Sequence, residues 1–190
     1  MISLRSFPQV LPLLLLPGLL AAGLAIAADA TPDFTGVWVF NEQRSDDLRA
    51  RVEEAVGPET TRGDIKKDVV RVWIRQWLLG VLEDPESRYL TIEQSPETFK
   101  SGVGDDVSVY YFGREAASRG PAGGTLRVKV YWKDAQLITE ETAGDGGRIT
   151  AVYTLLPGDA TLLIAYRLEH KSLKKPLEVA MFFDRENEGD

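Results

Sequence analysis

The sequence of 190 residues contains no cysteine and only one histidine, His170. Without cysteine the chain has no disulfide, no thiolate metal site and no thiol nucleophile. A single histidine leaves almost no material for a Ser-His-Asp triad or a multi-histidine metal site, so we expect neither a metal nor another cofactor. The net charge of −7, from 22 basic and 29 acidic residues, argues against nucleic acid as the main partner.

Residues 1–30 have the features of a secretory signal peptide. Arg5 precedes an apolar run from Val10 to Ala28, and small residues follow in two Ala-x-Ala triplets that end at Ala27 and Ala30. An uncleaved membrane anchor is the alternative, because the run approaches the length of a spanning helix. The prolines within the run and the paired cleavage sites favour removal. We therefore expect residues 31–190 to form one domain in the periplasm or outside the cell.

The first part of this domain predicts one strand followed by two helices. Residues 34–41 alternate with the period of a strand. Ser45 is expected to precede a helix whose first turn contains Asp46 and Asp47 and which stops at Gly57-Pro58. A second helix is expected from Asp64, with a broad apolar stripe that includes Trp73 and Trp77, and Asp84-Pro85 should end it. The helical insert thus spans residues 43–84.

From Ser87 onward, short alternating runs separated by turn residues indicate a mainly β fold. Strands every 8–12 residues with short connections favour an antiparallel up-and-down barrel. We expect about eight strands, with residues 97–101 as an extension or a loop and the Gly- and Ala-rich residues 113–124 as a loop. The expected strands cover residues 34–41, 89–94, 107–112, 125–132, 136–142, 148–155, 161–168 and 177–184.

The two ends of this domain resemble those of the lipocalins and related calycins. Gly36-Val37-Trp38 resembles the Gly-x-Trp motif of their first strand, and Arg185 resembles the arginine of their last strand, which packs over that tryptophan. Parity along the last strand also points Arg185 inward, where a cation needs a partner. The chain further resembles uncharacterised exported bacterial proteins that begin with Phe-Thr-Gly-x-Trp and end with a Phe/Tyr-Asp-Arg strand, a group without a known activity. The long helical insert and the lack of disulfides depart from typical lipocalins.

The helical insert follows the first strand, which in a lipocalin-like barrel runs toward the open end. Three interpretations of its apolar stripe stay open at this point: packing as core, a hydrophobic lid over a ligand cavity, and a membrane-surface helix. Membrane contact is disfavoured because acidic residues dilute the basic ones on the second helix.

The expected barrel interior is apolar with phenolic hydroxyls, which suits a lipid, quinone or aromatic molecule. A barrel of about eight strands either is filled by side chains or holds one small ligand, and the alternation pattern serves both. The candidate ligand-binding residues are Trp73, Trp77, Val128, Val130, Trp132, Ile149, Tyr153, Tyr166 and Met181.

No catalytic constellation is visible in the sequence. Glu140 and Glu141 are adjacent on a strand and point to opposite sides, so they do not form a catalytic pair. The glycine-rich residues 102–104 and 144–147 lack the features of a phosphate loop. We therefore expect a non-enzymatic exported binding protein for a small hydrophobic ligand, held in or at the mouth of the barrel. The alternative is an envelope protein-interaction module with a filled barrel, whose helices dock a protein partner.

Overall fold

The computed structural model describes residues 31–56, 74, 78–119, 124–173 and 175–186. Within these ranges no helix is long and apolar enough to cross a membrane. The strands, in chain order, are β1 Gly36–Phe40, β2 Tyr89–Gln94, β3 Thr98–Val103, β4 Asp106–Tyr111, β5 Ala116–Arg119, β6 Thr125–Lys133, β7 Gln136–Ala143, β8 Arg148–Leu155, β9 Thr161–Glu169 and β10 Leu177–Arg185. Helix α1 spans Leu48–Val56, a short 3₁₀ helix η1 spans Pro85–Arg88, and residues 74 and 78–83 are also helical.

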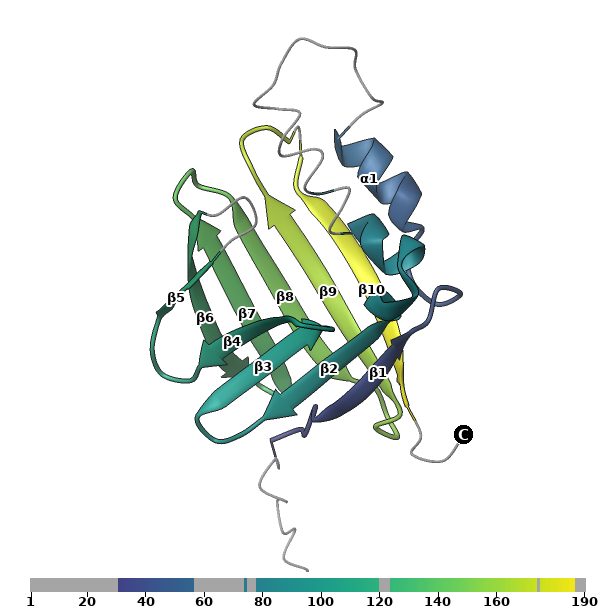
Figure 1. Ribbon diagram of the computed structural model, residues 1–190, viewed down its shortest axis with the longest axis vertical. Helices are drawn as coiled ribbons and strands as arrows, with labels where there is room; N and C mark the ends of the chain where they lie inside the picture. The colour runs from purple at the N-terminus through teal and green to yellow at the C-terminus, as the bar shows by residue number, and fades with distance from the viewer. Residues whose placement is uncertain (1–30, 57–73, 75–77, 120–123, 174, 187–190) are drawn as a thin grey trace, which may run out of the picture. The chain divides into compact units, whose positions relative to one another are not determined.

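All ten strands form one antiparallel sheet that curls into a nearly closed barrel (Figure 1). The strand order is β4-β3-β2-β1-β10-β9-β8-β7-β6-β5. Between the two ends of this order, the structure gives an isolated parallel bridge that joins Phe112 to Val130 of β6. The fold class expected from the sequence is confirmed, and the seam of the barrel lies beside β4 rather than at the chain ends.

The expected strand number was too low. Residues 97–101 were expected to be an extension or a loop, but Thr98–Val103 forms β3, which pairs along its length with β2 and β4. The expected loop at residues 113–124 contains β5, which pairs with β6 from Ala116 to Arg119. Small side chains give β5 no apolar alternation, so its strand character comes from hydrogen bonding to a neighbour.

The first and last strands meet at a contact between Trp38 and Arg185, which are register partners in the β1–β10 pair. The Arg185 guanidinium carbon lies 4.2 Å from the centroid of the Trp38 ring, and Nη1 donates to the Thr35 carbonyl at 2.6 Å. The Trp38 indole Nε1 donates to the Phe34 carbonyl at 2.9 Å. This geometry agrees with the expected packing of the arginine over the tryptophan, and it satisfies the polar groups of both side chains.

Gly36 is required beside this contact because of its backbone and its surroundings. Its φ of +144° is a conformation that residues with a side chain rarely adopt, and a β-carbon built there would lie 2.8 Å from Nη1 of Arg185. The Gly-x-Trp motif therefore leaves room for the arginine as well as supplying the ring beneath it.

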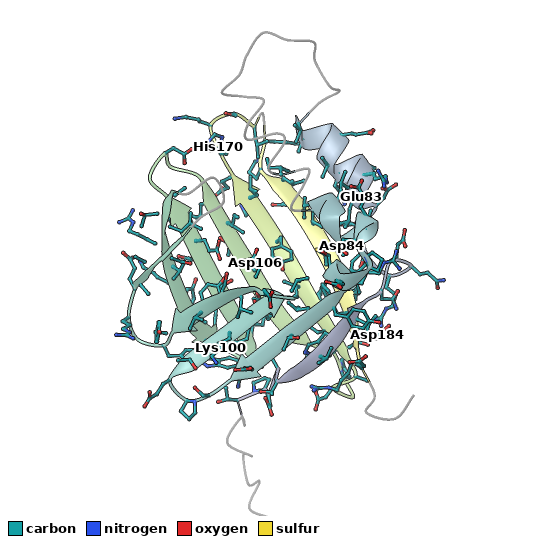
Figure 2. The ribbon with its side chains drawn as sticks, viewed as in Figure 1. Glu83, Asp84, Lys100, Asp106, His170 and Asp184 are labelled. Atoms are coloured by element: carbon teal, nitrogen blue, oxygen red, sulfur yellow. The ribbon has the colours of Figure 1, made fainter. Side chains whose placement is uncertain are left out.

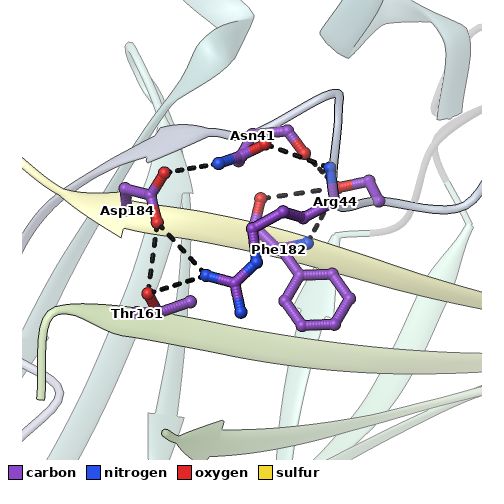
Figure 3. A network of polar contacts seen from close by, with 6 residues as sticks. Asn41, Arg44, Thr161, Phe182 and Asp184 are labelled. Carbon is purple, nitrogen blue, oxygen red and sulfur yellow. Dashed lines mark hydrogen bonds and ion pairs between the residues drawn. The ribbon is translucent and has the colours of Figure 1, made fainter. Parts of the chain in front are cut away.

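The chain between β1 and α1 is attached to β10 by a polar network (Figure 3). The Asn41 side chain donates to Asp184 at 2.6 Å, and the Ser45 hydroxyl accepts from the Phe182 backbone N–H at 2.9 Å. Asp46 accepts from the Ala180 backbone N–H at 2.8 Å. Ser45 and Asp46 thus extend the pairing with β10. The sequence had suggested instead that these residues start the helix.

Asp47 is the residue that begins α1, since its carboxylate accepts from the Ala50 backbone N–H at 3.0 Å in the manner of an N-cap. The expected apolar stripe is present, because Leu48, Val52 and Val56 are buried. In the second half of the insert, Ile74, Leu78 and Leu79 are buried within the same core as the barrel strands. The proposed start of the second helix at Asp64 lies outside the described residues.

We predict that Trp38 and Arg185 stabilise the fold as a coupled pair. Trp38→Ala should cost about 3–5 kcal/mol because a fully buried ring leaves a cavity, and Arg185→Ala should cost about 2 kcal/mol through lost charge-assisted hydrogen bonds. In chemical denaturation, the double variant should show a coupling energy of about 0.5–3 kcal/mol.

The control cycle combines Trp38→Ala with Arg148→Ala, which removes an exposed arginine from β8. That pair should be additive to within about 0.5 kcal/mol. Additive costs in the Trp38–Arg185 cycle would contradict the packed pair.

Candidate ligand site inside the barrel

Strands β6 to β10 present three successive registered rows of inward-facing side chains. From the closed end to the open end these are a floor row (Trp132, Leu137, Tyr153, Ile164, Met181), a middle row (Val130, Thr139, Ala151, Tyr166, Val179) and an upper row (Val128, Glu141, Ile149, Leu168, Leu177). All the barrel residues expected from the sequence to bind ligand occur in these rows. The predicted Trp73 and Trp77 lie outside the described residues.

The closed end of the barrel is filled by contacts between aromatic rings. Trp132 stacks on Phe34 with ring centroids 5.8 Å apart and on Phe112 at 6.2 Å. Tyr153 packs edge-on against Phe99 at 5.1 Å. Phe99 belongs to β3 and Tyr153 to β8, which are opposite walls of the barrel according to the strand order. Side chains therefore span the whole interior at the floor row, so Trp132 and Tyr153 form the base of any ligand site.

Above the floor row, several inward-facing side chains keep exposed surface. Glu141 and Ile149 in the upper row, Tyr166 in the middle row and Trp132 in the floor row are half-buried, whereas the other side chains of the middle and upper rows are buried. Glu141 and Ile149 are register partners on neighbouring strands. An inward-facing side chain on a central strand keeps exposed surface where the interior is open to solvent. The candidate site is therefore the open half of the barrel, between the floor row and the mouth.

Among the described residues of the middle and upper rows, Glu141 has the one carboxylate. Tyr110 of β4 donates its hydroxyl proton to Glu141 Oε1 at 2.5 Å, which connects β4 to β7 across the seam of the barrel. Burial raises the pKa of Glu141, opposed by the Tyr110 hydrogen bond and reinforced by the negative charge of Asp106. The interior therefore holds an acid that is costly to ionise in the empty barrel.

A group of hydroxyls lies beside this acid. The Tyr153 hydroxyl lies 3.3 Å from the Ser101 hydroxyl and also hydrogen bonds with Thr139 and Tyr166. Burial raises the pKa of Tyr153 to about 12, so the phenol stays protonated at neutral pH. Burial also raises the pKa of Tyr110 and of Tyr166. Neutral hydroxyls therefore occupy the deep part of the site, and the acid Glu141 lies above them in the upper row.

Sequence reasoning missed Glu141 as a site residue. It correctly placed Glu140 and Glu141 on opposite faces, and Glu140 indeed points outward, where it accepts from the Tyr131 hydroxyl at 2.9 Å. The parity of β7 was the available signal, because Leu137 and Thr139 share the inward face with Glu141. The charge of Glu141 obscured this parity signal, since acidic residues on strands usually face solvent.

The outer face of the same strands carries a shallow depression of a different character. Its volume is about 140 Å³, and its lining is charged and polar: Glu115, Arg127, Lys129, Glu140, Thr142 and Arg148. Lys129 forms an ion pair with Glu115 at 3.1 Å. This lining does not suit an apolar molecule, although it provides a useful control position in Glu140.

His170 lies in the connection between β9 and β10, at the open end (Figure 2). Its Nδ1 accepts from the Ser172 backbone N–H at 3.0 Å, and its Nε2 lies 3.1 Å from an Asp145 carboxylate oxygen. The Gly147 backbone N–H and the His170 ring hold the pKa of Asp145 below its usual value. These contacts join two neighbouring turns, so His170 has a structural role at the rim.

Comparisons with known proteins identify the fold but no family. No family model matches the chain, and no curated protein matches its sequence. The fold is similar to that of lipid binding protein 8 from Caenorhabditis elegans, with a TM-score of 0.51 at 12% identity over 80% of this chain and 95% of the other. It is also similar to secretory abundant heat soluble protein 4 from Ramazzottius varieornatus, with a TM-score of 0.51 at 11% identity over 80% and 94% of the two chains. Human cRBP IV matches with a TM-score of 0.49 at 13% identity over 82% and 99%. The chain therefore has a lipocalin- and calycin-like barrel fold.

We predict that Glu141 makes the stability of the empty protein fall as the pH rises. The folded-state pKa of Glu141 is raised, so the folded state holds more protons than the unfolded state between the two pKa values. The loss of stability that comes from ionising Glu141 is absent below its unfolded-state pKa of about 4.3 and is complete above its folded-state pKa. The free energy of unfolding of Glu141→Gln minus that of the wild type should therefore increase with pH over that window.

Chemical denaturation at a series of pH values from 4 to 8 measures this difference. The titratable groups that face Glu141 are Tyr110 and Asp106 on β4, Tyr153 on β8 and Tyr166 on β9, and the three tyrosines do not titrate in this range. Glu140→Gln on the outer face is the matched control and should give a nearly constant difference. A constant difference for Glu141→Gln as well would contradict the assignment.

Proposed function

We propose that this protein is exported and binds a small apolar ligand non-covalently in the open half of its barrel. The observation that carries the proposal is the partly exposed inward surface above the floor row, around Ile149 and Tyr166. Such a surface lies inside the protein and is mostly apolar, as is typical of small-molecule sites. The name of lipid binding protein 8, which shares the fold, supports the same class of ligand. Because one fold hosts many functions, the site itself carries the argument.

The geometry supplies a binding mode. A ligand enters at the end of the barrel that carries the β7–β8 and β9–β10 turns, descends past Ile149 and Leu168, and stops on the floor row at Tyr153. Burial of its apolar surface supplies the affinity, at about 25 cal/mol per Å² before the cost of immobilisation. The hydroxyls of Tyr166 and Tyr153 offer polar contacts at the bottom.

A filled barrel that serves as an envelope interaction module is the second candidate. The cross-barrel contacts of Phe99 with Tyr153 favour it, because they already fill the closed half. The two candidate functions predict different effects of a larger side chain at Ala151. This small buried residue lies in the middle row between Thr139 and Tyr166.

We predict that Ala151→Leu is accommodated in the fold and weakens ligand binding. If the middle row borders open space, the larger side chain occupies ligand volume and should reduce affinity for the neutral fluorescent probe N-phenyl-1-naphthylamine by about ten-fold, which corresponds to 1.4 kcal/mol. Stability should be unchanged within about 1 kcal/mol. Fluorescence titration and thermal denaturation measure the two quantities.

Ala165→Leu is the matched control, since Ala165 is exposed on the outer face of β9. It should leave both probe affinity and stability unchanged. A loss of about 1–3 kcal/mol in Ala151→Leu, together with no probe binding by the wild type, would indicate an overpacked, filled interior and would favour the interaction module.

Export has its own test. We expect protein recovered from its native host to be found outside the cytoplasm and to begin at Ala28 or Thr31, after one of the two Ala-x-Ala triplets. Cell fractionation and the intact mass of the purified protein measure location and start. A chain that keeps residues 1–30 and stays in the cytoplasm would overturn export without affecting the ligand proposal.

A further inference from the structure

We propose that the ligand of this barrel is an apolar amine, whose protonated nitrogen is bound by the carboxylate of Glu141. This inference rests on the proposed function and names the chemical class of its ligand. It distinguishes the site from one built for a fatty acid, whose head group is itself a carboxylate.

The first observation behind this proposal is the distribution of charge inside the barrel. Of the basic residues on β1–β4 and β6–β10, Arg185 alone shares an inward face, whereas Lys129 and Arg148 belong to the outer face. Arg185 lies at the closed end and is engaged by the Trp38 ring and by the carbonyls of Thr35 and Asp159. No cation on these strands is therefore available to an anionic head group in the open half.

The second observation behind this proposal is the position of Glu141. It is second in the upper row, and its register neighbours on both sides, Val128 and Ile149, are apolar. Among the described residues, the Tyr110 hydroxyl is the one donor to this carboxylate, and it contacts Oε1. A carboxylate accepts about four hydrogen bonds through its two oxygens. Most of its acceptor capacity is thus open to a ligand.

The half-buried environment explains why a cation suits this acid. A desolvated carboxylate is costly when it has no counter-charge, and an ammonium group that donates to it removes that cost. A ligand carboxylate in the same place would add like-charge repulsion and would find no cationic partner on the described strands. An alcohol donates one neutral hydrogen bond and should bind with intermediate affinity.

Three ligands of equal chain length test the proposal on the whole mature protein: decylamine, decanol and decanoate. Their displacement of N-phenyl-1-naphthylamine at pH 7.5 gives three relative affinities. We expect decylamine to bind at least ten-fold more tightly than decanoate, with decanol between them, because only the amine forms a charge-assisted hydrogen bond with the carboxylate.

Glu141→Gln keeps the shape of the side chain and removes its charge. It should weaken decylamine binding about ten- to hundred-fold while leaving decanol within about three-fold of the wild type. Glu140→Gln makes the same change one residue away on the outer face and should leave all three affinities unchanged. If Glu140→Gln rather than Glu141→Gln lost decylamine, the amine would be bound in the outer depression and the proposal would be wrong.

The comparison among ligands in the wild-type protein needs no variant, so it decides the question even if Glu141→Gln folds poorly. Binding of the probe and decanol without a preference for decylamine over decanoate would overturn the amine assignment and leave the proposed function standing. Failure of the probe and of all three ligands to bind would overturn the proposed function itself, and the amine assignment with it.

Discussion

The contact between Trp38 and Arg185 joins the first strand of the barrel to the last, and the closed end of the fold depends on it. Arg185 binds the Trp38 face, the Thr35 carbonyl and the Asp159 carbonyl, so one cation holds the chain before β1, β1 itself and the β8–β9 turn together. Glycine is the only residue type that fits beside Arg185 at position 36. A charge at this end of the barrel is tolerated because each of its donors has a partner.

The closed end and the open half of the barrel differ in how their interior side chains are packed. Aromatic contacts fill the interior up to Tyr153 and supply packing that does not depend on a ligand. Above that row the half-buried Glu141 and Tyr166 lie in surroundings that are neither solvent nor packed core. Stability is therefore concentrated at the closed end, and the open half keeps polar groups that a packed core would exclude.

The sequence predicted the parts of this architecture that follow from side-chain periodicity. Strands such as β6, β8 and β10 alternate clearly, so their bounds and inward faces could be derived from residue order alone. The strand β5 could not, because its identity comes from hydrogen bonds to β6 rather than from its own side chains. The role of Ser45 and Asp46 was hidden for a similar reason: their partners are backbone amides of β10, more than 130 residues away along the chain.

Glu140 and Glu141 show why charge composition alone does not describe such a site. The two residues have the same chemistry and are adjacent in the chain, yet Glu140 meets Tyr131 at the outer surface and Glu141 meets Tyr110 inside the barrel. Burial raises the pKa of Glu141. A net charge of −7 reports the outer surface, where solvent screens it. Glu141 lies inside the barrel in a medium of lower dielectric constant, so its charge interacts more strongly with neighbouring groups than the charge of an acid on the outer face does.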